Sequence, residues 1–210
     1  MQLKREGIAY IISAPSGTGK STVCKILLDR LANLKISVSH TTREARPAEA
    51  HGKDYFFVSE EEFKKKIEED AFIEWAKVHN NYYGTTKASI EKIKNNGYDV
   101  IVEIDVQGAE TLRDKEFEGV YIFLLPPSLK ELKNRLTKRS TETMEKIEQR
   151  MNVAEKEIAE YKNYYYIVTN FEVKDTVCKL SAIMQAEKRK MFRYVPTSPD
   201  LELIINPQDT

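Results

Sequence analysis

The chain has 210 residues, its 33 Lys and Arg balance 33 Asp and Glu, and 41% of its residues are hydrophobic. This length suggests one large domain spanning residues 1–210, and the composition argues against a repeat array or a small disulfide scaffold. A neutral charge balance gives no reason to expect a nucleic acid or an anionic membrane as partner. The first apolar run, Ile8 to Ile12, is too short for a signal peptide or a membrane span, so the cytoplasm is the expected compartment.

Apolar runs rich in β-branched and aromatic residues alternate with segments of helical period along the whole chain. This pattern is typical of parallel strands joined by crossover helices, and it predicts an α/β fold with a parallel central sheet flanked by helices. The expected strands are Ile8–Ser13, Ile36–Ser39, Asp99–Ile104, Val120–Leu125 and Tyr165–Thr169. The expected helices are Lys20–Ala32, Thr86–Asn96, Ser128–Lys138, Glu142–Tyr161 and Lys174–Arg193. Ser128 and Glu131 have capping-box spacing at the start of the third helix.

The segment from His40 to Tyr83 departs from this rhythm. Its residues alternate between apolar and polar in Tyr55–Val58 and in Phe72–Val78, which indicates short strands. Between them lies the charged segment Ser59–Asp70, which opens with a capping-box pair, Ser59 and Glu62. A small, mainly antiparallel insertion with one helix is therefore expected.

Two further segments stand out by composition. The run from Lys130 to Arg139 carries five basic residues against one acidic residue, a local charge of +4 in a neutral chain. The C-terminal tail, residues 191–210, places three prolines around the short apolar run Leu201–Ile205, and the sequence assigns it no role.

The strongest chemical signal is a phosphate-binding loop, Ala14-Pro-Ser-Gly-Thr-Gly-Lys20-Ser21, between a buried strand and a helix. Gly17 and Gly19 let backbone N–H groups turn toward a phosphate, Lys20 reaches the β and γ phosphates, and the Ser21 hydroxyl ligates Mg²⁺. Ala14 occupies a position where the strict pattern has Gly, and it is tolerated there if φ is not positive. The expected ATP-binding residues of this loop are Ala14, Pro15, Ser16, Gly17, Thr18, Gly19, Lys20, Ser21 and Thr22.

The insertion supplies further ordered motifs: Ser39-His-Thr-Thr-Arg43-Glu-Ala-Arg46, Gly52-Lys-Asp-Tyr55-Phe-Phe-Val-Ser, Phe72-Ile-Glu74-Trp-Ala and Tyr82-Tyr83-Gly84-Thr85. Others follow it: Glu103-Ile-Asp105-Val-Gln107-Gly, Leu125-Pro-Pro-Ser and Arg135-x3-Arg139. With the phosphate-binding loop, they resemble the guanylate kinase family over residues 8 to about 190. The resemblance implies a P-loop nucleotide kinase fold that transfers a phosphate from ATP to GMP with Mg²⁺. It also implies a GMP-binding region at residues 36–89 and a helical lid at residues 128–160.

On this resemblance, the phosphate of GMP is held by four side chains. Arg43 and Arg46 offer planar guanidinium groups three residues apart, and Tyr55 and Tyr83 add phenol hydroxyls. Arginines in a polar loop are otherwise usually solvated, and the surrounding motifs favour the functional interpretation here.

Recognition of guanine falls to Glu74 and its neighbours. An ionised carboxylate only accepts hydrogen bonds, and guanine presents two adjacent donors, N1–H and the 2-amino group. The competing interpretation places Glu74 on the outward face of an edge strand. Thr85 and Ser39 carry hydroxyls that can donate to O6, and Asp105 can accept the remaining 2-amino hydrogen. Whether Ser39 faces the base or the phosphate stays open.

The lid is expected to contribute Arg135, Arg139 and Arg150 over the phosphates of ATP, with a helix of solvated charges as the competing interpretation. Asn170 matches a family position near adenine. The expected catalytic residues are Lys20, Arg43, Arg135, Arg139 and Arg150. The chain has Ser140 and Ala45 where the family usually has Gly and Pro.

Two other functions compete with this one. A kinase for another nucleoside monophosphate would not need Glu74 with Thr85. A catalytically silent protein-binding module, as found in scaffold proteins, would not need its phosphate-binding residues. This chain keeps Lys20, Ser21, Arg43, Arg46, Arg135 and Arg139. ATP and GMP are thus the expected partners, and the oligomeric state is not predicted.

Overall fold

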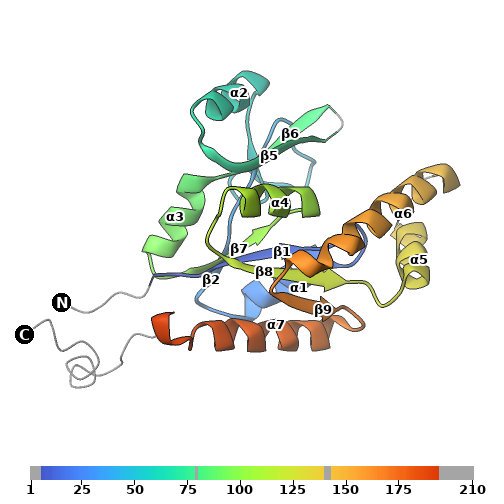
Figure 1. Cartoon of the computed structure of the whole chain (residues 1–210). Coiled ribbons are helices and arrows are strands. Elements are labelled where there is room, and N and C mark those ends of the chain that lie inside the picture. The colour runs from blue at the N-terminus through green and yellow to red at the C-terminus, as the bar shows by residue number, and fades with distance from the viewer. Residues whose placement is uncertain (1–5, 79, 140–142, 194–210) are drawn as a thin grey trace, which may run out of the picture.

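The structure is a computed structural model that describes residues 6–78, 80–139 and 143–193. A five-stranded sheet with the strand order β2-β7-β1-β8-β9 lies at its centre, and every pair of neighbouring strands is parallel (Figure 1). Its strands are β1 (Ala9–Ser13), β2 (Leu34–Ile36), β7 (Asp99–Glu103), β8 (Val120–Leu125) and β9 (Tyr166–Thr169). The predicted α/β class with a parallel central sheet is confirmed.

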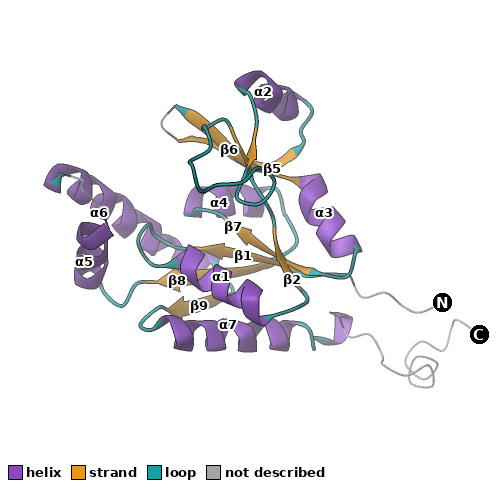
Figure 2. Ribbon diagram, turned by 180° about the vertical axis from the view of Figure 1, so that it is seen from behind, coloured by secondary structure: helices purple, strands orange, loops and turns teal. Residues whose placement is uncertain are grey.

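Helices cover both faces of this sheet, and successive residues of β1 point to opposite faces. Tyr10 and Ile12 belong to the core shared with α1 (Lys20–Arg30) and α7 (Val173–Glu187). Ala9 and Ile11 belong to the core shared with α3 (Lys87–Asn95) and α4 (Val106–Asp114). Figure 2 shows the sheet between these two helical layers. Since both faces are buried, the strands read as continuous apolar runs.

The insertion forms a second sheet with the order β4-β3-β6-β5. Its strands are β3 (His40–Thr41), β4 (Phe56–Phe57), β5 (Phe72–Val78) and β6 (Asn81–Thr86). β6 is antiparallel to both β3 and β5, whereas β3 and β4 are parallel. Helix α2 (Glu60–Glu68) begins at Ser59, where both hydrogen bonds of the predicted capping box with Glu62 are present. The expectation of a mainly antiparallel insertion with one helix is confirmed.

The structure adds one helix that was not expected and corrects two expected elements. Helix α4 was not predicted, although its buried residues Val106, Ala109 and Leu112 recur at helical spacing. The strand expected at Ile36–Ser39 lies at Leu34–Ile36 instead, where it pairs with β7. The helix expected over Lys174–Arg193 ends at Glu187, and a 3₁₀ turn follows at Met191–Arg193.

Helices α5 (Leu129–Arg139) and α6 (Met144–Ala159) pack on one another through Leu132, Leu136 and Ile147. Ser128 Oγ accepts a hydrogen bond from the Glu131 N–H, as expected, while the Glu131 carboxylate pairs with Arg135. A 3₁₀ helix, Glu160–Asn163, leads from α6 toward β9. No helix within the described ranges is both long and apolar enough to cross a membrane.

Candidate active site

The chemistry-bearing motifs gather at the carboxyl edge of the parallel sheet. The P-loop follows β1, Asp105 follows β7, and Asn170 follows β9. Open α/β sheets bind ligands at this edge, because the loops that leave neighbouring parallel strands meet there. The strand order therefore brings together motifs that lie far apart in the sequence.

The P-loop curves around a cavity of about 350 Å³. Gly17 (φ 88°) and Gly19 (φ 99°) adopt the left-handed conformation that turns their backbone toward it. The predicted loop residues that line the cavity are Ala14, Pro15, Ser16, Gly17, Gly19, Lys20, Ser21 and Thr22. Three acidic residues, Glu103, Asp105 and Glu157, complete the lining. Thr18, the remaining predicted loop residue, is buried behind it.

Hydrogen bonds to neighbouring residues hold the side chains of Lys20 and Ser21 at this cavity. Lys20 Nζ donates a hydrogen bond to the carbonyl of Ile104, and Ser21 Oγ donates one to Glu103 Oε1. Glu103 opens one of the motifs quoted from the sequence, but no role was assigned to it there. The signal was present, since an acidic residue ends the buried strand next to the P-loop strand.

Helix α6 reaches the P-loop at Ser16. The Arg150 guanidinium donates to Ser16 Oγ at 2.7 Å. About two turns farther along the helix, Glu157 accepts a hydrogen bond from the Ser16 backbone N–H. Burial and the nearby Asp105 raise the pKa of Glu157. Sequence reasoning missed Glu157, because a glutamate on a charged helix carries no distinguishing pattern.

Arg135 and Asn170 support the P-loop from behind. Arg135 donates to the carbonyls of Thr18 (3.2 Å) and Asn170 (3.4 Å), and its Nε pairs with Glu131 at 2.9 Å. The Asn170 amide donates to the Thr18 carbonyl at 2.7 Å and accepts from Thr176 Oγ1 at 2.8 Å. Arg139 is the last residue of α5, and its side chain lies outside the described part of the structure.

The second half of the site surrounds Glu74, which lies on β5, an edge strand of the inserted sheet. Only 8% of Glu74 is exposed, which rules out the outward-facing orientation on an edge strand. Its carboxylate is hydrogen-bonded to Thr85, whose hydroxyl lies 3.0 Å from Ser39 Oγ. Burial, opposed by the Thr85 hydrogen bond and reinforced by Asp105, raises the pKa of Glu74 to about 7.

Arg43 and its neighbours form the polar end of the inserted region. Its Nη2 donates to both carboxylate oxygens of Glu49 at 2.9 Å, and its guanidinium lies over the Tyr55 ring, 5.6 Å from the ring centroid. Tyr55 and Tyr83 have ring centroids 6.1 Å apart, and Tyr83 is also hydrogen-bonded to Arg43. Arg46 is exposed at the rim of this cluster. Glu49, which sequence reasoning missed, therefore fixes the orientation of Arg43.

Asp105 joins the two halves of the site. It lines the P-loop cavity, and its carboxylate caps α4 by accepting from the Gly108 N–H at 2.7 Å. A Cβ placed on Gly108 would lie 3.2 Å from Asp105 Oδ1 and 3.3 Å from Glu74 Oε2. The two carboxylates thus approach one another over a residue that has no side chain. The arrangement places a buried carboxylate close to Asp105, which lines the P-loop cavity.

Comparisons with known proteins point to one family. The sequence model of the family described as guanylate kinase matches residues 6–187. A guanylate kinase of Caldanaerobacter subterraneus is 50% identical over 92% of this chain and 94% of its own length. One from Geobacter metallireducens is 45% identical over 93% and 96%. The crystal structure of guanylate kinase from Anaplasma phagocytophilum superposes with a TM-score of 0.75, at 33% identity, and covers 98% of this chain and 97% of that one.

Proposed function

The chain belongs to the guanylate kinase family, and from this premise we propose that it transfers the γ-phosphoryl group of ATP to GMP, forming ADP and GDP. The observation that carries the proposal is the junction at Asp105, where the buried Glu74 carboxylate approaches a residue that lines the P-loop cavity. A base-recognising pocket beside a triphosphate site is the arrangement that a nucleoside monophosphate kinase requires. The product would supply purine nucleotide metabolism in the cytoplasm.

In the acceptor half, ionised Glu74 accepts hydrogen bonds from guanine N1–H and the 2-amino group. When GMP binds, the single proton of the Thr85 hydroxyl turns from Glu74 to O6, with Ser39 behind it, and Asp105 accepts the second 2-amino hydrogen. Adenine would place its N1 acceptor against the carboxylate, so AMP would be rejected. The phosphate of GMP is held by Arg43, Arg46, Tyr55 and Tyr83, with Arg43 already oriented by Glu49.

In the donor half, the chain mainly positions and neutralises phosphates, because a loose phosphoryl-transfer transition state needs little covalent help from the protein. The P-loop amides and Lys20 bind the β and γ phosphates, and Arg150 and Arg139 approach them from the lid. Arg135 braces the loop through the Thr18 carbonyl. Residues 128–160 act as the lid, and residues 36–89 as the GMP-binding region.

The oxygen donors of the cavity suit Mg²⁺, since Ser21 and Glu103 lie in contact beside the P-loop. Magnesium typically takes one or two protein oxygens together with substrate phosphates. Ser21 and Glu103 would hold the ion, and when bound it neutralises charge on the β and γ phosphates. Lys20 and the lid arginines act on the same charge from the protein side.

A coupled assay tests the function. Wild-type protein receives ATP and Mg²⁺ with GMP, AMP, UMP or TMP in separate reactions, and ADP formation is followed. Turnover with GMP at least about 100-fold above the others is expected, because a site built to hydrogen-bond one base strongly rejects bases that lack its donors. Equal turnover with all four would refute guanine selectivity, and no turnover with any would favour a silent binding module.

A further inference from the structure

Strand β5 is irregular at the point where it presents Glu74. In its ladder with β6, Phe72 is opposite Thr86 and Glu74 is opposite Thr85, so Ile73 is an extra residue without a partner. An extra residue of this kind bends the strand and re-aims the next side chain. The Ile73 side chain is only 3% exposed and packs in the core against α4, which anchors the bulge to the central domain.

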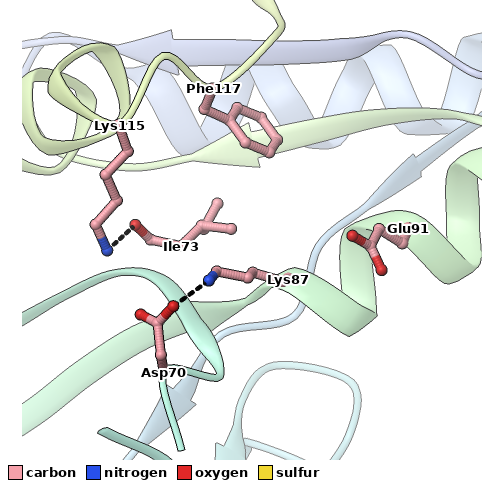
Figure 3. Close-up of a pocket in the computed structure, with 6 residues that line it drawn as sticks. All are labelled: Asp70, Ile73, Lys87, Glu91, Lys115 and Phe117. Atoms are coloured by element: carbon pink, nitrogen blue, oxygen red, sulfur yellow. Dashed lines mark hydrogen bonds and ion pairs between the residues drawn. The ribbon is translucent and has the colours of Figure 1, made fainter.

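The backbone carbonyl of Ile73, the bulged residue, accepts a hydrogen bond from Lys115. Lys115 follows the last turn of α4, and its Nζ donates a hydrogen bond to the Ile73 carbonyl at 3.0 Å (Figure 3). That carbonyl belongs to the peptide unit that joins Ile73 to Glu74. Helix α4 and its C-cap therefore contact β5 at two points, with Lys115 on the Ile73 carbonyl and Gly108 against the Glu74 carboxylate.

Electrostatics adds to this contact. Burial has the largest effect on the pKa of Glu74, and two charged groups that flank α4 also act on it: its N-cap Asp105 raises the pKa and its C-cap Lys115 lowers it. On the neighbouring strand β6, Thr85 provides a neutral hydroxyl. Lys115 thus opposes the cost of ionising a carboxylate that must be ionised to accept from guanine.

We propose that Lys115 is a positioning residue for guanine recognition, holding the bulge at Ile73 so that Glu74 points to Asp105 and the base. Lys115 acts through Glu74 and takes no part in the transfer itself. The inference rests on the proposed function, because it assigns Lys115 to the guanine pocket of that site.

The same region contains a matched control. Lys115 borders a cavity of about 430 Å³ that is lined by Asp70, Ile73, Lys87, Glu91, Lys115 and Phe117. Lys87 also presents its ammonium there, but it pairs with Asp70 at 2.5 Å rather than with the backbone of β5 (Figure 3). Lys115→Met and Lys87→Met therefore each remove one positive charge from the same cavity. Only Lys115→Met also removes the hydrogen bond to the Ile73 carbonyl.

The test measures GMP binding by calorimetry without ATP, together with KM for each nucleotide. For Lys115→Met we expect a Kd and a KM for GMP that are about tenfold higher, the effect of one hydrogen bond from a charged donor. The KM for ATP should stay within about twofold, because the donor site is built from other residues. Lys87→Met should remain within about twofold for both nucleotides, and Lys115→Arg, which keeps a charged donor, should recover most of the loss.

A pH profile separates positioning from general support of the fold. With Lys115→Met, the acid limb of kcat/KM for GMP should move to higher pH, because Glu74 loses the charge that favours its ionised form. Lys87→Met should leave that limb in place. An unchanged limb with an unchanged Kd for GMP would overturn the proposal, as would a Lys115→Met variant in which the KM values for ATP and GMP rise together. Wild-type protein that binds GMP without phosphorylating it would refute the proposed function, and the Kd comparison would still decide the role of Lys115.

Discussion

At the scale of single residues, the proposed function assigns the choice of base to Glu74. Its burial on an edge strand shows that the carboxylate faces inward. Glu74→Gln keeps the shape but replaces one acceptor oxygen by an NH₂ donor, so that one guanine N–H meets another donor. An unpaired buried donor costs about 1 to 3 kcal/mol, and a charge-assisted bond is lost as well. We therefore expect kcat/KM for GMP to fall about 10² to 10⁴-fold.

Steady-state kinetics with each nucleotide varied in turn checks this. The KM for ATP should hardly change, and AMP should gain little, since Thr85 and Asp105 remain arranged for guanine. Glu91→Gln, an exposed glutamate on α3, is the control for a neutralised carboxylate. GMP kinetics within about threefold of wild type in Glu74→Gln would mean that guanine is recognised elsewhere.

The same carboxylate predicts how GMP binding depends on pH. With the Glu74 pKa raised to about 7, the free protein is partly protonated there at neutral pH, whereas guanine needs the ionised form. Affinity for GMP should fall as pH drops below about 7, by at most about tenfold per unit. Proton release on binding, from calorimetry at pH 7 in buffers of different ionisation enthalpy, measures this. Glu74→Gln retains only the titration of the GMP phosphate, so equal proton release by both proteins would contradict the assignment.

The stability contribution of Glu74 in the free protein should depend on pH in the opposite sense to GMP affinity, and fall as pH rises. The unfolded carboxyl titrates near 4.5, and the folded one near 7 because burial disfavours its charge. The contribution of Glu74 is therefore fully present below pH 4.5 and is lost as pH rises through about 7. Denaturation of wild type and Glu74→Gln across this window should show Glu74→Gln gaining relative stability with rising pH. A constant difference would mean that the Glu74 pKa is not raised.

At the scale of elements, the strand, loop and helix from β1 to α1 form the donor site as a unit. Lys20 projects from the first turn of α1 and contacts the Ile104 carbonyl, and within the described residues no hydrogen bond joins it to Glu74, Thr85 or Ser39. Lys20→Ala should lower kcat about 10² to 10³-fold or more, because it removes a positive charge from the transferring phosphates. Calorimetric affinity for GMP should stay within about threefold. The exposed Lys25→Ala on the same helix is the control, and substantial turnover by Lys20→Ala would show that Lys20 does not bind these phosphates.

The elements also show how far sequence reasoning reaches. The buried strands were predicted because helices on both faces leave them uniformly apolar, and α2 was predicted because its capping box is a local pattern. Helix α4 was missed because its cap, Asp105, was already interpreted as a ligand, and Gly108 weakens a helical pattern. Glu157 and Lys115 act through contacts with residues far away in the sequence, the Ser16 amide and the Ile73 carbonyl, and Glu49 acts on the Arg43 side chain within one loop. Single-sequence patterns do not encode such pairings.

At the scale of the whole molecule, the donor and acceptor sites belong to different sheets. The P-loop follows a strand of the five-stranded sheet, and Glu74 lies on the four-stranded sheet, with α4 between them. In-line transfer requires the two phosphates to meet with water excluded, while both nucleotides must be able to enter and leave. We therefore expect the inserted region and the lid to close toward one another when both sites are filled.

Small-angle scattering tests this closure. A compact chain of this length has a radius of gyration of about 17 Å, and the free protein should exceed the value measured with a bisubstrate analogue that joins adenosine and guanosine through phosphates. The matched control is the analogue that joins two adenosines, which fills the donor site but offers the Glu74 pocket a base that it rejects. It should compact the protein less, because the inserted region gains no contact from it. Equal scattering from the free protein and the adenosine–guanosine complex would show that the two sites are already assembled without their nucleotides.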